Sequence, residues 1–238
     1  MALYLLPNTF DDQQSPSLLL PEGLSSLLCE LDGLIAESER TGRRYLIKLM
    51  QDREHARRMP IYLYHKGSSQ KELTLFVEKI VGGEKLGLIS DAGMPVLADP
   101  GNRLVRMLRK KGYEDIHAIP GPSSIFLALI LSGFPAQSFH FHGYLPKEKK
   151  ARRSVLQAIE KEAQNGSTQL WMETPYRNAV LFEECIRTFH PTTYLALASD
   201  LTLENHSVKV FSIAQWRTKT IVLPKHPTIF LLWRARAV

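Results

Sequence analysis

Residues 86–105 read LGLISDAGMPVLADPGNRLV, and residues 118–132 read AIPGPSSIFLALILS. In each stretch a short apolar run ends in small, turn-forming residues, and a helical pattern follows. This order predicts a strand, a tight loop and a helix in both places. In open α/β sheets, ligands bind at such loops, outside the carboxyl ends of the strands. The two loops are therefore the first candidates for a binding site.

The same alternation extends in both directions along the chain. Apolar runs predict strands at residues 2–7, 34–38, 61–65, 86–90, 115–120, 139–145, 168–173, 193–201, 208–213, 220–223 and 228–233. Helical spacing of apolar residues predicts helices at 22–34, 41–50, 69–81, 99–111, 123–131, 152–164 and 178–189. Alternating strands and helices in the first half favour a parallel sheet, and consecutive strands near the end favour a mixed one. The sequence Pro120-Gly121-Pro122 is typical of a hinge, so we expect two α/β domains, 1–119 and 120–238.

Composition narrows the class of protein. The chain has 238 residues, of which 44% are hydrophobic and 23% charged, as in soluble globular proteins. Its two cysteines, Cys29 and Cys185, form no CxxC motif, which argues against a disulfide framework and structural zinc and favours a reducing, cytoplasmic location. The N-terminus lacks the basic start of a secretory signal. The longest apolar run, residues 125–131, is too short to cross a membrane.

Basic residues point to a polyanionic partner. The formal net charge is +6, and five of the seven residues from 147 to 153 are cationic. Lys147, Lys149, Lys150, Arg152 and Arg153 are candidates for contacts with RNA phosphates, which would make binding salt-dependent. A second basic group occupies the helix predicted at 99–111. A solvated helix face is the alternative for both groups.

The loop residues themselves suggest chemistry. Ala92 and Gly93 let backbone groups approach a ligand closely, and Asp91 can accept hydrogen bonds from hydroxyl or ammonium groups. Ser123 is placed to cap the next helix, whose first amides form a weak anion site. The alternative is that these residues only shape turns. His140 and His142 share a strand face, but no third ligand type clusters with them, so we expect no metal.

Taken together, several strings resemble one family. SDAGMPVLADPG, IPGPSSIFLALILSG, FHGYLP with its basic stretch, and METPYR occur in the order found in the tetrapyrrole methylase superfamily of S-adenosylmethionine methyltransferases. The strings are most similar to the branch that methylates 2′-hydroxyls of small-subunit ribosomal RNA, and ASDLTLENH resembles a further segment of that branch. The resemblance covers about residues 34–220.

The resemblance implies two α/β domains, each with a mixed or mostly parallel sheet flanked by helices, with the cofactor cleft between them. It also implies a homodimer and an S-adenosylmethionine cofactor held without a GxGxxG fingerprint. Carried over by motif position, the cofactor-binding residues would be Pro7, Asp91, Ala92, Gly93, Met94, Ser123 and Ser124, with Glu173, Thr174, Ala196 and Thr228 as weaker candidates.

A ribose hydroxyl is a poor nucleophile at neutral pH, so a base should lie within hydrogen-bond reach of it. Asp91, Glu173 and His206 are candidates by residue type. Glu173 can instead serve a structural or cofactor hydrogen bond, and His206 can be an ordinary surface histidine.

The chain also departs from the branch. LYLLPNTFDD lacks the glycine that the branch carries near its N-terminus, Leu203 replaces a lysine, Asp200 a glutamate and Tyr176 a histidine. These differences keep two alternatives open. One is a methyltransferase with a tetrapyrrole or other small-molecule acceptor, and the other is a cofactor- or RNA-binding module without turnover.

Overall fold

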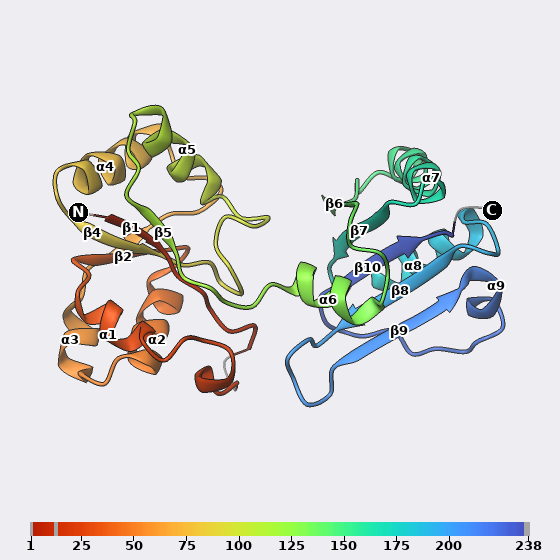
Figure 1. The fold of residues 1–238 in the computed structure, drawn as a ribbon, viewed down its shortest axis with the longest axis horizontal. Helices are drawn as coiled ribbons and strands as arrows, with labels where there is room; N and C mark the ends of the chain where they lie inside the picture. The colour runs from red at the N-terminus through yellow and green to blue at the C-terminus, as the bar shows by residue number, and fades with distance from the viewer. Residues whose placement is uncertain (1, 12–13, 236–238) are drawn as a thin grey trace. The chain divides into compact units, whose positions relative to one another are not determined.

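The structure is a computed structural model that describes residues 2–11 and 14–235. The chain divides into two compact units, Met1–Ser123 and Ser124–Val238, where the sequence placed the boundary between residues 119 and 120. Each unit contains one five-stranded sheet with helices packed on it (Figure 1). The predicted fold class, two α/β domains with parallel and mixed sheets flanked by helices, is confirmed.

The sheet of the first unit is parallel throughout. Its strands, β1 (Ala2–Leu5), β2 (Gly33–Ala36), β3 (Ile61–Leu63), β4 (Lys85–Leu88) and β5 (Ile116–Ala118), lie in the order β3-β2-β4-β1-β5. Every neighbouring pair runs in the same direction. All five carboxyl ends therefore meet at one edge, which we call the first edge. Loops that leave this edge are the ones that bind ligands in sheets of this kind.

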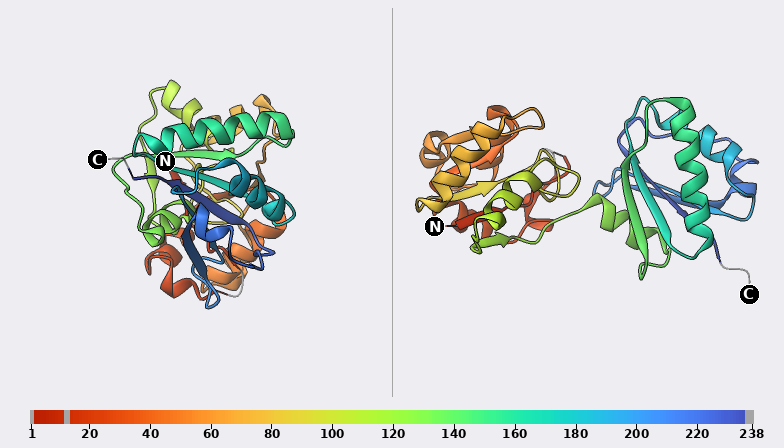
Figure 2. Two further views of the ribbon diagram at one scale, coloured as in Figure 1. Left: turned by 90° about the vertical axis from the view of Figure 1, so that its right-hand side faces the viewer. Right: turned by 90° about the horizontal axis from the view of Figure 1, so that it is seen from above.

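Helices cover both faces of this sheet. On one face lie α1 (Leu24–Cys29), α2 (Glu39–Leu49) and α3 (Arg53–Arg58), and on the other α4 (Gln70–Val81) and α5 (Asn102–Lys110) (Figures 1 and 2). Two separate apolar clusters fill the two interfaces. Two of these helices are capped at their N-termini by neighbouring side chains. Ser69 and Glu72 form a capping box at α4, and Ser38 accepts a hydrogen bond from the Thr41 amide at α2.

Two predicted helices in this unit were wrong in their bounds, and one helix was missed. The helix expected at 22–34 ends at Cys29, because residues 33–36 pair as β2 between β3 and β4. Helix α3 was not predicted. The helix expected from Asp99 begins at Asn102, because the Asp99 carboxylate accepts hydrogen bonds from the Val96 and Gly101 amides and shapes the preceding turn instead.

The sheet of the second unit is mixed. Its strands are β6 (Phe139–Tyr144), β7 (Thr168–Glu173), β8 (Tyr194–Ser199), β9 (Ser207–Ser212) and β10 (Thr228–Trp233), in the order β6-β7-β10-β8-β9. Only the β6–β7 pair is parallel. The closing pair of strands that was expected is wrong: residues 220–223 are irregular, and β10 alone fills the position between β7 and β8.

Both faces of this second sheet are also covered. Helices α7 (Lys149–Gln164), α8 (Asn178–Thr188) and α9 (Ile213–Trp216) share one core with Trp171, Phe230 and Leu232. Ile229 and Leu231 alternate with these residues along β10, so they face the opposite side. There α6 (Ser124–Ser132) contacts β8, β9 and β10. Within the described residues, no helix combines the length and apolar character needed to span a membrane.

Candidate functional site

Three loops meet at the first edge of the first unit. Residues 7–8 follow β1, residues 90–95 follow β4 and residues 119–122 follow β5. The backbones of Asn8 and Gly93 form a two-way bridge, with N–O distances of 2.9 and 3.2 Å. The Asn8 Nδ2 atom donates to the carbonyl oxygens of Ser90 and Asp91, both at 3.1 Å. The structure thus joins Pro7 and its neighbour to the loop that the sequence singled out.

Two glycines let these loops approach one another. Gly93 has a φ of +70°, and a Cβ there would lie 3.1 Å from the Pro122 carbonyl oxygen. Gly121 is closer still, because a Cβ there would lie 2.0 Å from the Pro7 Cβ and 3.3 Å from the Met94 sulfur. Neither position accepts a side chain without movement of the backbone. Pro7, Gly93 and Met94 therefore form one packed group with Gly121.

The backbone beyond this group is strained. Val96 and Ala98 adopt φ values of 76° and 58°, a region that residues other than glycine rarely occupy, and Val96 is β-branched. The Asp99 carboxylate holds this turn through the Val96 and Gly101 amides, at 3.2 and 2.8 Å. Strain of this kind costs roughly 1–3 kcal/mol at each residue and gathers at functional sites.

Carboxyl groups cluster at the same edge. Asp91 is exposed, whereas Asp99 and Glu37, the residue after β2, are partly buried. Burial raises the pKa of Glu37, and the nearby Asp91 and Asp99 carboxylates raise it further. Burial likewise raises the pKa of Asp99. Neither Glu37 nor Asn8 was predicted from the sequence, because their partners lie far away along the chain.

The exposed part of this loop suits a polar ligand. Asp91 and Ala92 are both exposed, while Gly93 and Pro95 beneath them are buried. Ser90 supports the loop by donating from its hydroxyl to the Ala92 carbonyl oxygen, at 2.9 Å. An exposed carboxylate beside a small side chain can accept hydrogen bonds from a ribose or from an α-ammonium group. These features fit the nucleoside and amino-acid ends of S-adenosylmethionine.

A second group of candidates lies at one end of the second sheet. Thr228 pairs with Glu173 on one side and with Ser199 on the other, so β7, β10 and β8 present these residues in one row. Thr174 follows directly. Asn178 donates from Nδ2 to the Pro224 and His226 carbonyl oxygens and to the Thr228 hydroxyl, at 2.9–3.0 Å. Ala196 is not part of this row, since it pairs with Leu231 in the middle of β8.

Glu173 is committed to neighbours within its own unit. Its side chain is fully buried, Oε1 accepts from the Thr174 amide at 2.7 Å, and Oε2 lies 3.1 Å from an Arg177 nitrogen. His206 is exposed, and its Nδ1 lies 3.3 Å from the Leu203 carbonyl oxygen. Asp200, in the same segment, contacts His226 and has a φ of 54°. Of the three base candidates, Asp91 is thus the exposed carboxylate.

Ser123 and Ser124 mark the junction between the units. Ser124 is the first residue of α6, and Ser123 is the last residue of the first unit. Both side chains are half-buried. The capping role expected of Ser123, the anion site beyond it and the cofactor cleft implied by the resemblance stay predictions.

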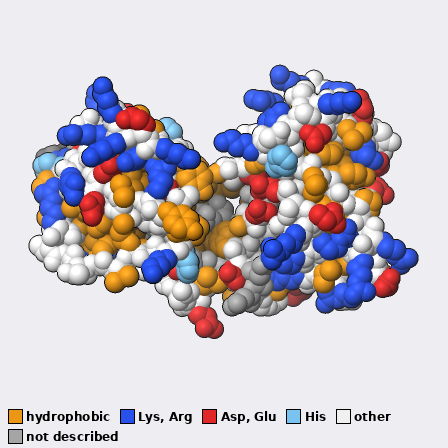
Figure 3. All heavy atoms as spheres, turned by 180° about the vertical axis from the view of Figure 1, so that it is seen from behind, with side chains coloured by type: hydrophobic (Ala, Val, Ile, Leu, Met, Phe, Trp, Pro, Cys, Tyr) orange, Lys and Arg blue, Asp and Glu red, His pale blue; other side chains and the backbone are white. Residues whose placement is uncertain are grey.

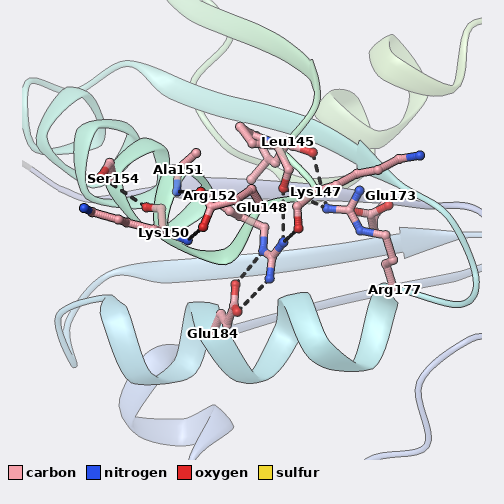
Figure 4. Close-up of polar contacts among 11 residues, drawn as sticks. Leu145, Lys147, Glu148, Lys150, Ala151, Arg152, Ser154, Glu173, Arg177 and Glu184 are labelled. Carbon is pink, nitrogen blue, oxygen red and sulfur yellow. Dashed lines mark hydrogen bonds and ion pairs between the residues drawn. The ribbon is translucent and has the colours of Figure 1, made fainter.

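The basic segment divides into exposed and buried members. Lys147, Lys149, Lys150 and Arg153 are exposed, at the start of α7. Lys and Arg side chains gather over the part of the second unit that contains α7 (Figure 3). Arg152 is only 6% exposed and faces α8 instead, where its Nε and Nη2 atoms lie 2.6 and 2.8 Å from the two Glu184 oxygens (Figure 4). Its guanidinium is therefore occupied inside the unit.

The histidine pair on β6 has a local role. His140 and His142 stack with ring centroids 4.1 Å apart, and His142 Nε2 lies 2.8 Å from the Gln169 side-chain oxygen. Burial lowers the pKa of His142. Across residues 2–11 and 14–235, no group of three His, Cys, Asp or Glu side chains is arranged to hold a metal ion.

Known proteins similar to this chain include ribosomal RNA methyltransferases. Ribosomal RNA small subunit methyltransferase I of Vibrio cholerae is 30% identical, over 65% of this chain and 52% of that protein. Its counterpart from Pseudomonas aeruginosa is 31% identical, over 71% of this chain and 67% of that protein. The Thermotoga maritima protein of the same name is 36% identical, over 57% of each. The chain thus spans about half the length of most of these curated relatives.

Solved structures share the fold. The methyltransferase CobJ matches with a TM-score of 0.60 and 17% identity, over 100% of this chain and 95% of that one. A uroporphyrin-III C-methyltransferase from Thermus thermophilus, complexed with S-adenosylhomocysteine, matches with a TM-score of 0.56 and 14% identity, over 98% and 97% of the two chains. The model of the Tetrapyrrole (Corrin/Porphyrin) Methylases family matches residues 26–216. Because that match covers well over half of the chain and most of the candidate residues, the chain belongs to the tetrapyrrole methylase family.

Proposed function

We propose that this chain is an S-adenosylmethionine-dependent methyltransferase that modifies a ribose 2′-hydroxyl of small-subunit ribosomal RNA. The packing of residues 7–8, 90–95 and 119–122 at the first edge carries the proposal, because it provides a rigid, exposed loop suited to the cofactor. Membership of the family and similarity to proteins named ribosomal RNA small subunit methyltransferase I support it.

Bound S-adenosylmethionine supplies an electrophilic methyl group on a sulfonium. The chain has to hold the acceptor oxygen in line with that methyl group and to accept the hydroxyl proton. Alignment lowers the barrier by up to about 7–11 kcal/mol in well-oriented intramolecular reactions. We assign the proton-accepting role to Asp91 in preference to Glu173 and His206. Asp91 is an exposed carboxylate on the candidate cofactor loop, while Glu173 is buried against Arg177 and Thr174.

The acceptor is proposed to be RNA because the second unit exposes a group of positive charges. Lys147, Lys149, Lys150 and Arg153 expose four cations at the start of α7. Such a group binds phosphates and makes RNA binding fall steeply with salt. Arg152 is left out of this contact because it pairs with Glu184. A homodimer and a cytoplasmic location belong to the same proposal, by resemblance to the family and by cysteine usage.

One observation favours a second acceptor. The uroporphyrin-III methyltransferase, which shares the fold, is named for a tetrapyrrole, and so is the family. A tetrapyrrole acceptor would use the same cofactor loop and would not need the basic segment.

Methyl transfer to competing acceptors tests the proposal. The chain is incubated with methyl-labelled S-adenosylmethionine, unmodified small-subunit ribosomal RNA and, separately, uroporphyrinogen III. We expect label in RNA, recovered after nuclease digestion as a 2′-O-methylated nucleoside. Label only in the tetrapyrrole would contradict the RNA proposal and support a tetrapyrrole acceptor. If neither acceptor is labelled although the cofactor binds, the result would support a binding module that has no methyltransferase activity.

A further inference from the structure

A short loop in the second unit is held by two arginines from different elements. Residues 145–147 connect β6 to α7, and each of their carbonyl oxygens faces a guanidinium (Figure 4). Arg152 Nη1 lies 2.7 Å from the Lys147 oxygen and 3.1 Å from the Pro146 oxygen. Arg177 Nη2 lies 3.2 Å from the Pro146 oxygen and 3.3 Å from the Leu145 oxygen. We call this arrangement the carbonyl clamp.

Carboxylates inside the unit fix both arginines of the clamp. The side chains of Arg152 and Glu184 are 7% and 15% exposed, and they pair through two bonds. The Arg152 guanidinium holds the pKa of Glu184 below its usual range. Arg177 pairs with the fully buried Glu173. A planar guanidinium held in this way has little freedom, so it fixes the direction of the carbonyl groups that it contacts.

The clamp links two parts of the proposed site. Glu173 also accepts hydrogen bonds from the Thr174 amide and hydroxyl, at the end of β7. The contacts therefore run from Thr174 through Glu173 and Arg177 to the carbonyl groups of residues 145–146. From there they continue to Arg152 and the start of α7. Figure 4 shows the Lys147 and Lys150 side chains extending away from the Arg152–Glu184 pair, in opposite directions.

Stability alone does not account for such a cluster. A buried ion pair contributes little net stability, since desolvation offsets its attraction, and apolar residues of similar volume often serve as well or better. By contrast, the Arg187–Glu183 pair on α8 is exposed and only links neighbouring turns of the helix. The clamp instead determines where residues 145–147 lie, and this segment carries the exposed Lys147 and leads directly into the exposed cations at the start of α7.

From this geometry we propose that Arg152 and Arg177 are positioning residues, which hold the basic segment at 147–153 in a fixed place relative to Glu173 and Thr174 so that it receives the phosphates of the RNA acceptor. The inference rests on the proposed function and deepens it. Neither arginine contacts RNA in this account. They act through the backbone of residues 145–147.

The test separates positioning from stability. In the double variant R152M/E184L, apolar side chains replace the buried pair, so the melting temperature should stay within a few degrees of that of the unchanged protein. The carbonyl groups of Pro146 and Lys147 lose a donor, however. We expect KM for small-subunit ribosomal RNA to rise about tenfold with kcat changed less than about twofold, the loss expected from one or two phosphate contacts. The slope of log Kd against log salt, measured by filter binding, should fall by about one to two.

The matched control is Arg187→Met, which removes an exposed arginine from the same helix. It should leave the RNA KM and the salt slope unchanged. An R152M/E184L variant with an unchanged RNA KM and salt slope would overturn the clamp while leaving the proposed function intact. An unchanged chain that neither binds nor methylates RNA would overturn both. Failure of R152M/E184L to fold would assign the pair to stability and overturn the inference.

Discussion

A Cβ atom built on Gly121 would lie 2.0 Å from the Cβ of Pro7, so the loops after β5 and β1 touch at a point where no side chain fits. Gly121→Ala should push these loops apart and displace Met94, whose sulfur lies 3.3 Å from the same position. We expect affinity for S-adenosylmethionine to fall at least about tenfold, equivalent to about 1.4 kcal/mol. Isothermal titration calorimetry measures this change.

Gly23→Ala is the matched control for that substitution. Gly23 precedes α1 with a φ of −69°, and a Cβ there meets nothing within 4 Å. Its affinity for the cofactor should equal that of the unchanged chain. Equal affinities for the Gly121 and Gly23 variants would contradict the role given to the packed loops.

Asp91→Asn tests the assignment of the proton acceptor. The amide keeps the size of the side chain and loses the ability to take a proton, so kcat should fall by about 10²–10⁴-fold. Glu173→Gln should instead lower the melting temperature, because Arg177 loses its buried partner, and should leave kcat largely unchanged. The opposite pattern would move the base to Glu173.

Glu37 gives the first unit a pH dependence of defined sign. Its pKa is raised in the folded state, chiefly by burial and then by the Asp91 and Asp99 carboxylates. The folded state therefore favours the protonated form, and stability that is present below the unfolded pKa is lost as pH rises through the folded pKa. Glu37→Gln removes this loss. The melting temperature of the variant, relative to the unchanged chain, should be higher at pH 8 than at pH 4, and an equal difference at both pH values would argue against it.

We predict that Tyr176 stacks on a base of the acceptor. Its side chain is 96% exposed and lies two residues after Thr174 and directly before Arg177. Stacking of an aromatic ring on a base contributes about 1–3 kcal/mol, so Tyr176→Ala should raise the RNA KM by about fivefold or more. Cofactor affinity should not change. Leu18→Ala, at another exposed apolar residue, is the control and should leave the RNA KM as it is.

Much of the fold could be predicted because most strands are short apolar runs bounded by turn residues. The end of α1 could not, since Leu31 and Leu34 continue the helical spacing although Leu34 lies on β2. A parallel strand buried on both faces has no alternation to distinguish it from a helix. The irregular path of residues 220–223 escaped prediction for a related reason. Ile221 and Leu223 pack against the core that α7, α8 and α9 share, without pairing as a strand.

The site was predictable where its chemistry is local. Gly93 and Gly121 lie in sequences typical of turns, so they could be predicted. Asn8 instead bonds Ser90 and Asp91, which are 82 and 83 positions away in the sequence, and no local pattern indicates this contact. Arg152 is a second residue whose role could not be predicted from local sequence. Its neighbours in the sequence are solvent-exposed cations, and only the partner Glu184, 32 residues later, turns it inward. Long-range polar pairs of this kind follow from the fold and not from spacing.

The proposed function requires that the loops at residues 7–8, 90–95 and 119–122 hold S-adenosylmethionine. Isothermal titration of the unchanged chain with S-adenosylhomocysteine, the demethylated product, tests this most directly. We predict saturable binding of one ligand per chain at micromolar concentration, weakened by Gly121→Ala and unchanged by Gly23→Ala. Absence of binding at millimolar ligand would contradict the claim and with it every methyltransferase function proposed for this chain.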